Sequence, residues 1–264
     1  MSDILDISWI QLSFAVIFIV ILVGISLYES LKLEKSMLLG AFRSSIQLII
    51  VGYLIQAIFE IDTWYIISLM LMIMLFVASQ TLIKRIKNRV KGMYFYALIA
   101  VSLASLLTLF IISQVIVNVK PWYDPRYMIP LAGMIIANGM NGAALAGERY
   151  RSELTLRLNE IEMLLSLGYD IKKASLRVRQ QALISALIPS VNNMMVMGIV
   201  HLPGMMTGQI IAGSNPVTAV KYQIVIILGI ASTVALTSWI FLSLLQKKFF
   251  TPDHQIRYEV IQTK

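Results

Sequence analysis

The chain has 264 residues, of which 58% are hydrophobic and 14% are charged, and its mean hydropathy is +0.78. This composition excludes an ordinary soluble domain. The chain has no cysteine, which excludes disulfides, thiolate metal sites and cysteine nucleophiles. The net charge of +8 does not by itself indicate a nucleic-acid partner, because an excess of Lys and Arg in a membrane protein usually marks its topology.

Long uncharged stretches predict an all-α integral membrane protein with about seven transmembrane helices in a single domain, residues 1–264. The expected spans are Ser8–Leu27, Met37–Phe59, Trp64–Ile83, Gly92–Val119, Tyr127–Gly147, Gln180–Val200 and Tyr222–Gln246. The first span lacks the basic flank and the cleavage site of a signal peptide, so we expect it to stay in the mature protein.

Basic residues are distributed unequally between the two sides of this arrangement. Of the 22 Lys and Arg residues, the loops after spans one, three and five and the C-terminal tail hold two, five, seven and four. The positive-inside rule therefore predicts a cytoplasmic C-terminus and an N-terminus outside. An uncleaved chain of this kind suits a multi-pass protein of the bacterial inner (plasma) membrane.

The long polar segment between the fifth and sixth spans is residues 148–180. Four apolar residues within it follow the spacing of one helical face, namely Leu154, Leu158, Ile161 and Leu165. Glu153 and Arg157 are four residues apart, in the order that favours an ion pair on a helix. These patterns predict a helix that continues outward from the fifth span.

The same segment carries signals for a turn and a second helix. Gly168 follows the apolar stripe, where a glycine ends a helix, and Asp170 can cap a second helix that starts at Ile171. We therefore expect a helix hairpin that leaves one span, turns at Leu167–Tyr169 and re-enters through the next. Such a hairpin offers a soluble partner a surface to hold, whereas the alternative is a solvated loop that only joins two spans.

Residues 180–220 are uncharged, a stretch longer than one crossing needs, and prolines and glycines interrupt it. We expect a sixth span to about Val200 and then a re-entrant or partly extended segment, Leu202–Asn215. Irregular backbone at bilayer depth occurs where it lines a cavity or a substrate path. This pattern is the strongest indication of transport that the residues themselves give.

Several polar or sulfur-containing side chains within the predicted spans are candidates for lining a translocation path. They are Asn138, Asn141, Ser190, Asn192, Asn193, Met197, His201 and Gln209. For the asparagines the alternative role is packing, because small residues and amides bring membrane helices together. For the methionines near His201 the alternatives are a soft-metal path and simple gap filling.

The chain carries no sign of its own catalytic chemistry. It has no G-x-x-x-x-G-K-[ST] loop to hold nucleotide phosphates and no H-E-x-x-H zinc motif. Its two histidines, His201 and His254, fall on opposite sides of the predicted membrane, so an intramembrane hydrolase is not expected. We predict a protein that is not an enzyme.

Three stretches resemble the FetB-type permeases, the membrane subunits of bacterial ABC transporters assigned to iron export and related to plant aluminium-tolerance membrane proteins. The stretches are IPLAGMIIANGMNGAALAGERYRSEL, EIEMLLSLGYDIKKA and LPGMMTGQIIAGSNPVTAVKYQIVI. The resemblance covers residues from about Met128 to Ile226 in its specific motifs. It implies a permease homodimer that pairs with a separate ATP-binding subunit, so that ATP acts only through that partner and this chain binds no cofactor.

The resemblance also implies that Glu160–Gly168 is a coupling helix, which docks into a groove of the ATPase. The expected anchors are the three leucines of this helix and its turn, and the two acids set the electrostatics of the rim. The expected coupling residues are Glu160, Glu162, Leu164, Leu165, Leu167 and Gly168.

The expected cargo is iron or a related metal, but the residues do not identify its ligands or the direction of transport. The resemblance supplies no His and carboxylate cluster, and the metal site stays unknown. Three alternatives remain open: an ABC permease for a nucleotide sugar or another small solute, a non-transporting membrane scaffold that recruits a soluble partner, and a secondary transporter or channel. The shortage of intramembrane Asp, Glu and Lys disfavours a proton relay.

Overall fold

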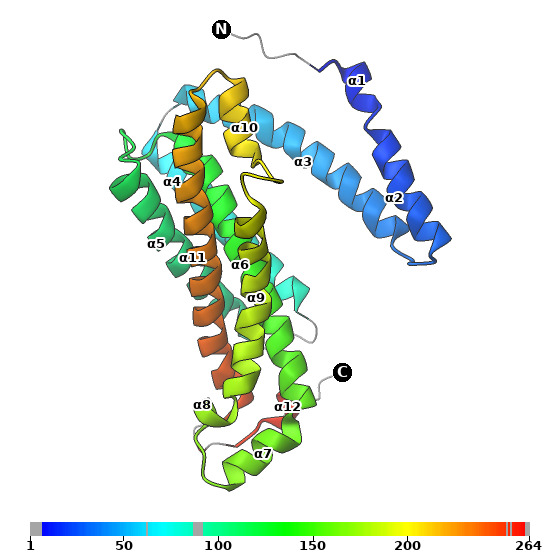
Figure 1. The fold of residues 1–264 in the computed structure, drawn as a ribbon, viewed down its shortest axis with the longest axis vertical. Coiled ribbons are helices and arrows are strands. Elements are labelled where there is room, and N and C mark those ends of the chain that lie inside the picture. The colour runs from blue at the N-terminus through cyan, green and yellow to red at the C-terminus, as the bar shows by residue number, and fades with distance from the viewer. Residues whose placement is uncertain (1–6, 62, 87–91, 252, 254, 262–264) are drawn as a thin grey trace. The chain divides into compact units, whose positions relative to one another are not determined.

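The computed structural model describes residues 7–61, 63–86, 92–251, 253 and 255–261 (Figure 1). Most of these residues are helical, and among them there is no strand beyond two isolated β-bridges. The predicted all-α class is confirmed. Contacts group the chain into two compact units, one built from the first three helices together with residues 211–213 and one from the rest of the helices that follow. The prediction of a single domain for the whole chain stays a prediction.

The first unit contains α1 (Trp9–Ser13), α2 (Val16–Tyr28) and α3 (Glu34–Ile61). The predicted first span is thus interrupted at Phe14–Ala15, a turn between α1 and α2. Most side chains of this unit are exposed within the chain. Apolar exposure of this extent suits helices that face lipid or other protein in a bilayer.

A buried serine fixes the connection between α2 and α3. The Ser26 hydroxyl donates to the Glu34 carboxylate at 2.8 Å and accepts the Leu33 N–H at 3.3 Å. The turn between them places Ser30 and Lys32 in the left-handed region, at φ values of 52° and 58°. Ser26 therefore replaces the water that would otherwise satisfy polar groups at this turn.

The second unit is a helix bundle. Its long helices are α4 (Trp64–Arg85), α5 (Met93–Phe110) with the π-helix η1 (Ile111–Ile116), α6 (Pro125–Leu156), α9 (Leu176–Val196) and α11 (Pro216–Phe249). Its short helices are α7 (Leu158–Ser166), α8 (Ile171–Ala174), α10 (Gly204–Ile211) and α12 (Tyr258–Ile261). The central helix is α6, which contacts α4, α5, α9 and α11 (Figure 1).

Glycines on α6 allow α11 to approach closely. A Cβ atom on Gly142 would lie 2.5 Å from Cγ1 of Val234, and one on Gly139 would lie 2.9 Å from Oγ1 of Thr237. A Cβ on Gly147 would collide with Phe241 and with a residue that follows α4. Small residues at such contacts are the usual basis of helix association in membranes. Gly139 and Gly142, which flank Asn141, thus lie at a close helix contact, as the packing alternative for this part of the fifth span requires.

Six helical segments of the described chain are long and apolar enough to cross a membrane. They are Trp9–Tyr28, Glu34–Ile61, Trp64–Arg85, Met93–Ile116, Pro125–Leu156 and Pro216–Phe249. The predicted sixth span is present as α9, but α9 does not reach the hydropathy of the other six because its first turns carry Arg177, Arg179 and two glutamines. The protein is therefore a multi-pass helical membrane protein, and the count of seven spans stays a prediction.

The segment Leu202–Asn215 is more helical than the sequence predicted. It contains α10, followed by a turn in which the Ser214 N–H donates to the Gln209 carbonyl at 2.9 Å and Gly213 has a φ of +90°. Asn215 then caps α11, because its side chain accepts the Val217 N–H at 2.9 Å. Whether this segment is re-entrant stays a prediction.

We expect Gly142→Ala to destabilise the bundle relative to Gly133→Ala. Both changes add the same methyl group to α6 and the same helix propensity, but the Gly133 Cβ would meet only Met74 Cε at an ordinary 3.6 Å. The Gly142 methyl group would press on the stiff Val234 side chain, and overpacking of this kind costs about 1–3 kcal/mol. Thermal unfolding in detergent should give a lower midpoint for Gly142→Ala. Equal midpoints for the two variants would contradict the close α6–α11 contact.

Candidate functional site

The predicted hairpin is present, but its first arm consists of two helices. Helix α6 runs without interruption from the bundle to Leu156, and the backbone breaks at Arg157, with φ −108° and ψ 22°, before α7 begins. The apolar stripe faces inward as expected: Leu154 and Ile161 are buried, and the other two members are half-buried. The predicted continuation of the fifth-span helix beyond Gly147 is confirmed, since the polar residues that follow belong to the same helix.

The turn of the hairpin follows the predicted signals closely. Gly168 adopts a φ of +85°, and the Tyr169 N–H donates to the Leu164 carbonyl at 3.1 Å. The Asp170 carboxylate accepts the Lys173 N–H at 2.8 Å and so caps α8. Both predicted end signals are confirmed in their local geometry.

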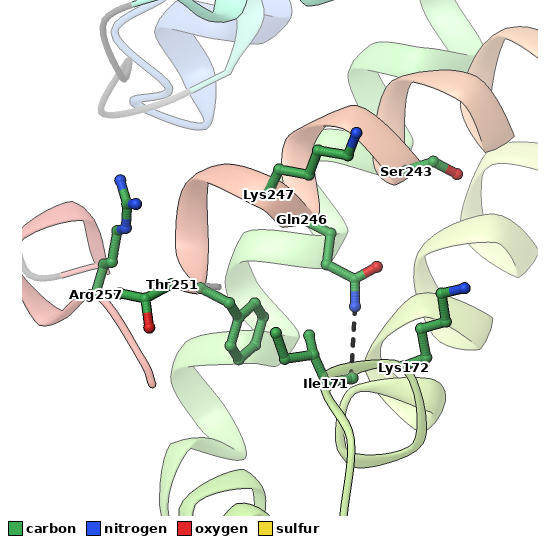
Figure 2. A pocket seen from close by; sticks show the side chains of 8 residues that line it. Ile171, Lys172, Ser243, Gln246, Lys247, Thr251 and Arg257 are labelled. Atoms are coloured by element: carbon green, nitrogen blue, oxygen red, sulfur yellow. Dashed lines mark hydrogen bonds between the residues drawn. The ribbon is translucent and has the colours of Figure 1, made fainter. Parts of the chain in front are cut away.

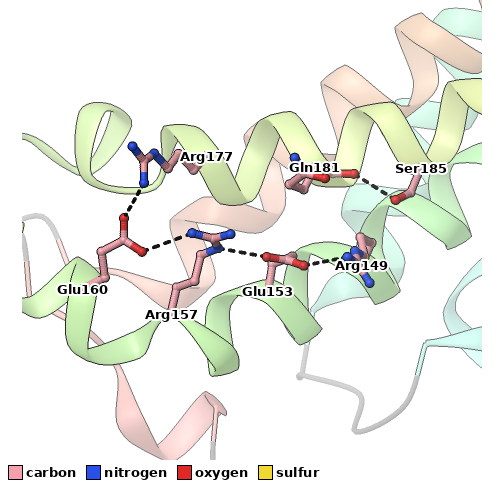
Figure 3. Close-up of polar contacts among 7 residues, drawn as sticks. All are labelled: Arg149, Glu153, Arg157, Glu160, Arg177, Gln181 and Ser185. Carbon is pink, nitrogen blue, oxygen red and sulfur yellow. Dashed lines mark hydrogen bonds and ion pairs between the residues drawn. The ribbon is translucent and has the colours of Figure 1, made fainter.

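Charged side chains of alternating sign form a chain that connects the two arms (Figure 3). Glu153 accepts Arg149 at 2.7 Å and Arg157 at 3.0 Å, and Arg157 also reaches Glu160 at 3.2 Å. The second oxygen of Glu160 accepts Arg177 of α9 at 3.3 Å. The hydrogen bonds to Glu153 and Glu160 raise the pKa of the Arg157 guanidinium above its ordinary value.

This charge chain spans the break at Arg157 and connects α6, α7 and α9. An isolated exposed pair contributes only about 0–1 kcal/mol, but several charges in a network give a more reliable contribution. Glu153 is buried, so its two guanidinium partners also satisfy a carboxylate that is shielded from water. The sequence pattern identified the Glu153–Arg157 pair and missed the pair between Glu160 and Arg177, which are seventeen residues apart.

The predicted coupling residues differ widely in exposure. Leu167 is 68% exposed at the tip, whereas Glu160, Glu162 and Leu164 are half-buried. Leu165 is also half-buried, and it lines a cavity together with residues of the C-terminal segment.

Two exposed apolar neighbours were missed by the sequence analysis. Met163 is 58% exposed and Tyr169 is 48% exposed. The apolar tip of the hairpin, defined as Met163, Leu167 and Tyr169, therefore has different members from the predicted anchor set. The helical periodicity identified the apolar residues that face inward. The tip could have been predicted from the apolar residues near the turn that fall outside this periodic set.

The returning arm is held against α11 by polar contacts. The Gln246 amide of α11 donates to the Ser175 hydroxyl at 2.7 Å, at the point where α9 begins. One turn further along α9, the Arg179 guanidinium donates to the Ser243 hydroxyl at 2.7 Å and lies 5.9 Å from the centre of the Trp239 ring. None of these contacts was predicted, because their members are at least sixty residues apart in the sequence.

The two asparagines of α6 each have a protein partner. The Asn138 amide donates to the Met134 carbonyl of its own helix at 2.8 Å. The Asn141 side chain accepts from the Arg85 guanidinium of α4. Only the Asn141 contact joins two helices, α4 and α6, and the role of both asparagines in a translocation path stays a prediction.

The remaining path candidates lie near the other end of α9. Ser190 is buried, Asn192 and Asn193 are exposed, and Met197 is half-buried where the helix ends. His201 is exposed and its carbonyl accepts the Gly198 N–H at 3.0 Å. Gln209 of α10 is half-buried.

Metal ligands are not identified by this arrangement. The described residues contain no group of three or more His, Asp or Glu side chains placed to hold a metal ion. His254 and the basic residues at 87–91 lie outside the part that the structure describes. The metal site therefore stays unknown.

Comparison with known proteins places the chain in a family of membrane proteins. The family described as uncharacterised protein family UPF0014 matches residues 9–250. The UPF0014 membrane protein YjkA of Bacillus subtilis strain 168 is 35% identical over 94% of this chain and 98% of its own length. No solved structure gives a significant match.

Two further relatives carry names that describe a role. The probable iron export permease protein FetB of Escherichia coli strain K12 is 35% identical over 93% of each chain. The protein ALUMINUM SENSITIVE 3 of Arabidopsis thaliana is 32% identical over 94% of this chain and 90% of its own length. The resemblance found in the sequence is confirmed, and the chain belongs to the UPF0014 family of membrane proteins.

Proposed function

We propose that this protein is the membrane-spanning permease subunit of an ATP-driven ABC transporter that exports iron or a related metal from the cytoplasm. The observation that carries the proposal is the hairpin, which presents an exposed apolar tip on two arms joined by ion pairs. The similarity to a probable iron export permease protein supports the cargo and the direction. ATP hydrolysis then belongs to a separate ATP-binding subunit, and two copies of the permease pair within the bilayer.

The hairpin suits mechanical coupling. A partner that holds Leu167 and its neighbours moves α7, which is joined to α6 through Arg157 and to α9 through the Glu160–Arg177 pair. Both arms continue directly into long helices of the bundle. Closure of the two ATP-binding subunits around ATP can therefore move α6 and α9 as rigid bodies. This movement would change the side of the membrane to which the translocation path is open.

The remaining features of the proposal follow from topology. The positive-inside rule places the hairpin and the C-terminus in the cytoplasm and the N-terminus outside, in the inner membrane of a bacterium. The chain itself uses no cofactor in this scheme. The path residues Ser190, Asn192 and Asn193 stand at the end of α9 away from the hairpin, where access would alternate.

Leu167→Asp should abolish coupling while leaving the membrane bundle intact. The change puts a charge on an exposed apolar anchor, and hot-spot anchors at interfaces contribute about 2 kcal/mol or more to binding. Leu156→Asp is the matched control, because Leu156 is 75% exposed but lies on α6 away from the tip. Co-purification with the ATP-binding subunit should fall at least about tenfold for Leu167→Asp only. Retention of the partner by both variants would reject the tip as the docking surface.

Cell-associated iron under iron load tests the cargo. Cells lacking the gene should accumulate iron, the wild-type gene should lower it, and the Leu167→Asp gene should leave it high. Leu165→Asp serves as a second variant; because Leu165 is half-buried, its insertion and stability are checked first. Iron that is unchanged by loss of the gene would overturn the iron assignment without affecting the partner-binding result.

Glu160→Gln should loosen the hairpin. It weakens the pairs with Arg157 and Arg177, whereas Glu162→Gln changes a neighbouring acid that makes no ion pair among the described residues. Because exposed pairs contribute about 0–1 kcal/mol each, amide hydrogen exchange at Leu167–Asp170 should rise by roughly two- to tenfold for Glu160→Gln. Equal exchange in the two variants would mean that the charge chain does not stabilise the turn.

A further inference from the structure

A cavity of about 370 Å³ lies at the hairpin end of the bundle, between α8, the last turns of α11 and the segment that follows α11 (Figure 2). Three basic side chains line it, one from each of these elements: Lys172, Lys247 and Arg257. No acidic residue lines it, and none of the three bases forms an ion pair within the described chain. The three side chains are exposed, and together they give the mouth of the cavity a positive potential that attracts anions.

The position of Lys247 alone has a simple explanation, since a lysine in the last turn of a helix is stabilised by the helix dipole. That explanation does not apply to Arg257, which lies beyond the helix. The backbone instead brings this residue back, because the Arg257 N–H donates to the Phe249 carbonyl at 2.9 Å. Figure 2 shows Arg257 on one side of Gln246 and Lys172 on the other, so the cations flank the cavity from two sides.

The rest of the lining combines an apolar wall, Ile171 and the buried Phe250, with the polar side chains of Ser243, Gln246 and Thr251. Cations beside an apolar wall, at the end of the membrane helix α11, match a phosphate headgroup with the start of its acyl chains. Basic pockets between transmembrane helices on the cytoplasmic side commonly hold anionic lipid headgroups.

We propose that this cavity binds the phosphate headgroup of an anionic phospholipid from the leaflet on the hairpin side. Lys172, Lys247 and Arg257 supply the positive charge, and the apolar wall accommodates the first part of the lipid chains. The floor of the cavity is Gln246, whose amide also holds Ser175 at the start of α9. The lipid therefore contacts the residue that fixes the returning arm of the hairpin.

Native mass spectrometry of the delipidated full chain in detergent tests this site. Phosphatidylglycerol is titrated against the wild type, the pocket variant K172Q/K247Q/R257Q and the control variant K32Q/K35Q/K173Q. Both variants lose three charges, so nonspecific attraction falls equally. At about 1 kcal/mol per base, the pocket variant should bind at least about tenfold more weakly, and the control should remain within about twofold of wild type.

Two further arms separate the possible sources of the phosphate. Phosphatidylcholine should bind the wild type more weakly than phosphatidylglycerol does, and inorganic phosphate at millimolar concentration should not displace phosphatidylglycerol. Displacement by inorganic phosphate, or equal binding of the two lipids, would overturn the assignment to an anionic phospholipid. An equal loss of binding in the two triple variants would overturn the site itself.

A single substitution keeps the test informative if the pocket variant does not fold. Lys247→Gln should weaken phosphatidylglycerol binding about fivefold, from the loss of one base. Lys248→Gln is its matched control, because the Lys248 ammonium lies 5.6 Å from the centre of the Tyr96 ring and does not line the cavity. Equal effects of these neighbouring substitutions would also reject the site. The binding readout is independent of transport and of any ATPase, so it can fail or succeed separately from the proposed function.

Discussion

The close contact between α6 and α11 is the constraint on which the second unit depends. Lipid chains are as apolar as leucine, so membrane helices associate through packing and not through the hydrophobic effect. The face that α6 turns to α11 carries Gly139 and Gly142. On α11 the hydroxyls of Thr233 and Thr237 donate to carbonyls of their own helix at 2.9 and 2.7 Å. These two hydroxyls are thus satisfied within α11 itself and need no partner from α6.

The hairpin takes its position from this same pair of helices. Its outgoing arm is the end of α6 followed, after the break at Arg157, by α7, and its returning arm is bonded to α11 through Gln246 and Ser243. The ion pairs of Glu160 then connect the two arms across the break at Arg157. A load on α7 is therefore carried by two anchored helices. A solvated loop that only joins two spans would not show these links, so the described geometry favours the structured hairpin over that alternative.

The sequence predicted those features of the hairpin that depend on residues no more than about four positions apart in the chain. The turn at Gly168, the cap at Asp170 and the Glu153–Arg157 pair depend on backbone geometry that a local pattern specifies. The pair of Glu160 with Arg177 could not be predicted, since it requires the turn to bring the two arms together. The exposure of Leu165 could not be predicted either, because a distant C-terminal segment shields it.

The ends of the helices differ from the ends of the predicted apolar spans for a related reason. Hydropathy detects where a helix becomes polar, and α6 becomes polar well before it ends at Leu156. Helix α9 shows the opposite arrangement, since its polar first turns lower the hydropathy of a helix that continues into an apolar stretch. Both differences lie next to the hairpin, at the polar end of α6 and the polar start of α9. These two polar helix ends form the region that we propose couples the bundle to a soluble partner.

Gln246 connects this coupling region to the basic cavity. Its side chain forms the floor of the cavity and also donates to the Ser175 hydroxyl, which in turn donates to the Ile171 carbonyl at 2.6 Å. A ligand that strengthens this arrangement stabilises one position of the returning arm over others. Linkage makes the effect reciprocal: a partner that moves the arm must change the affinity of the cavity by the same factor. Lipid occupancy and the movement of the hairpin are then two readouts of one equilibrium, and each can be measured without the other.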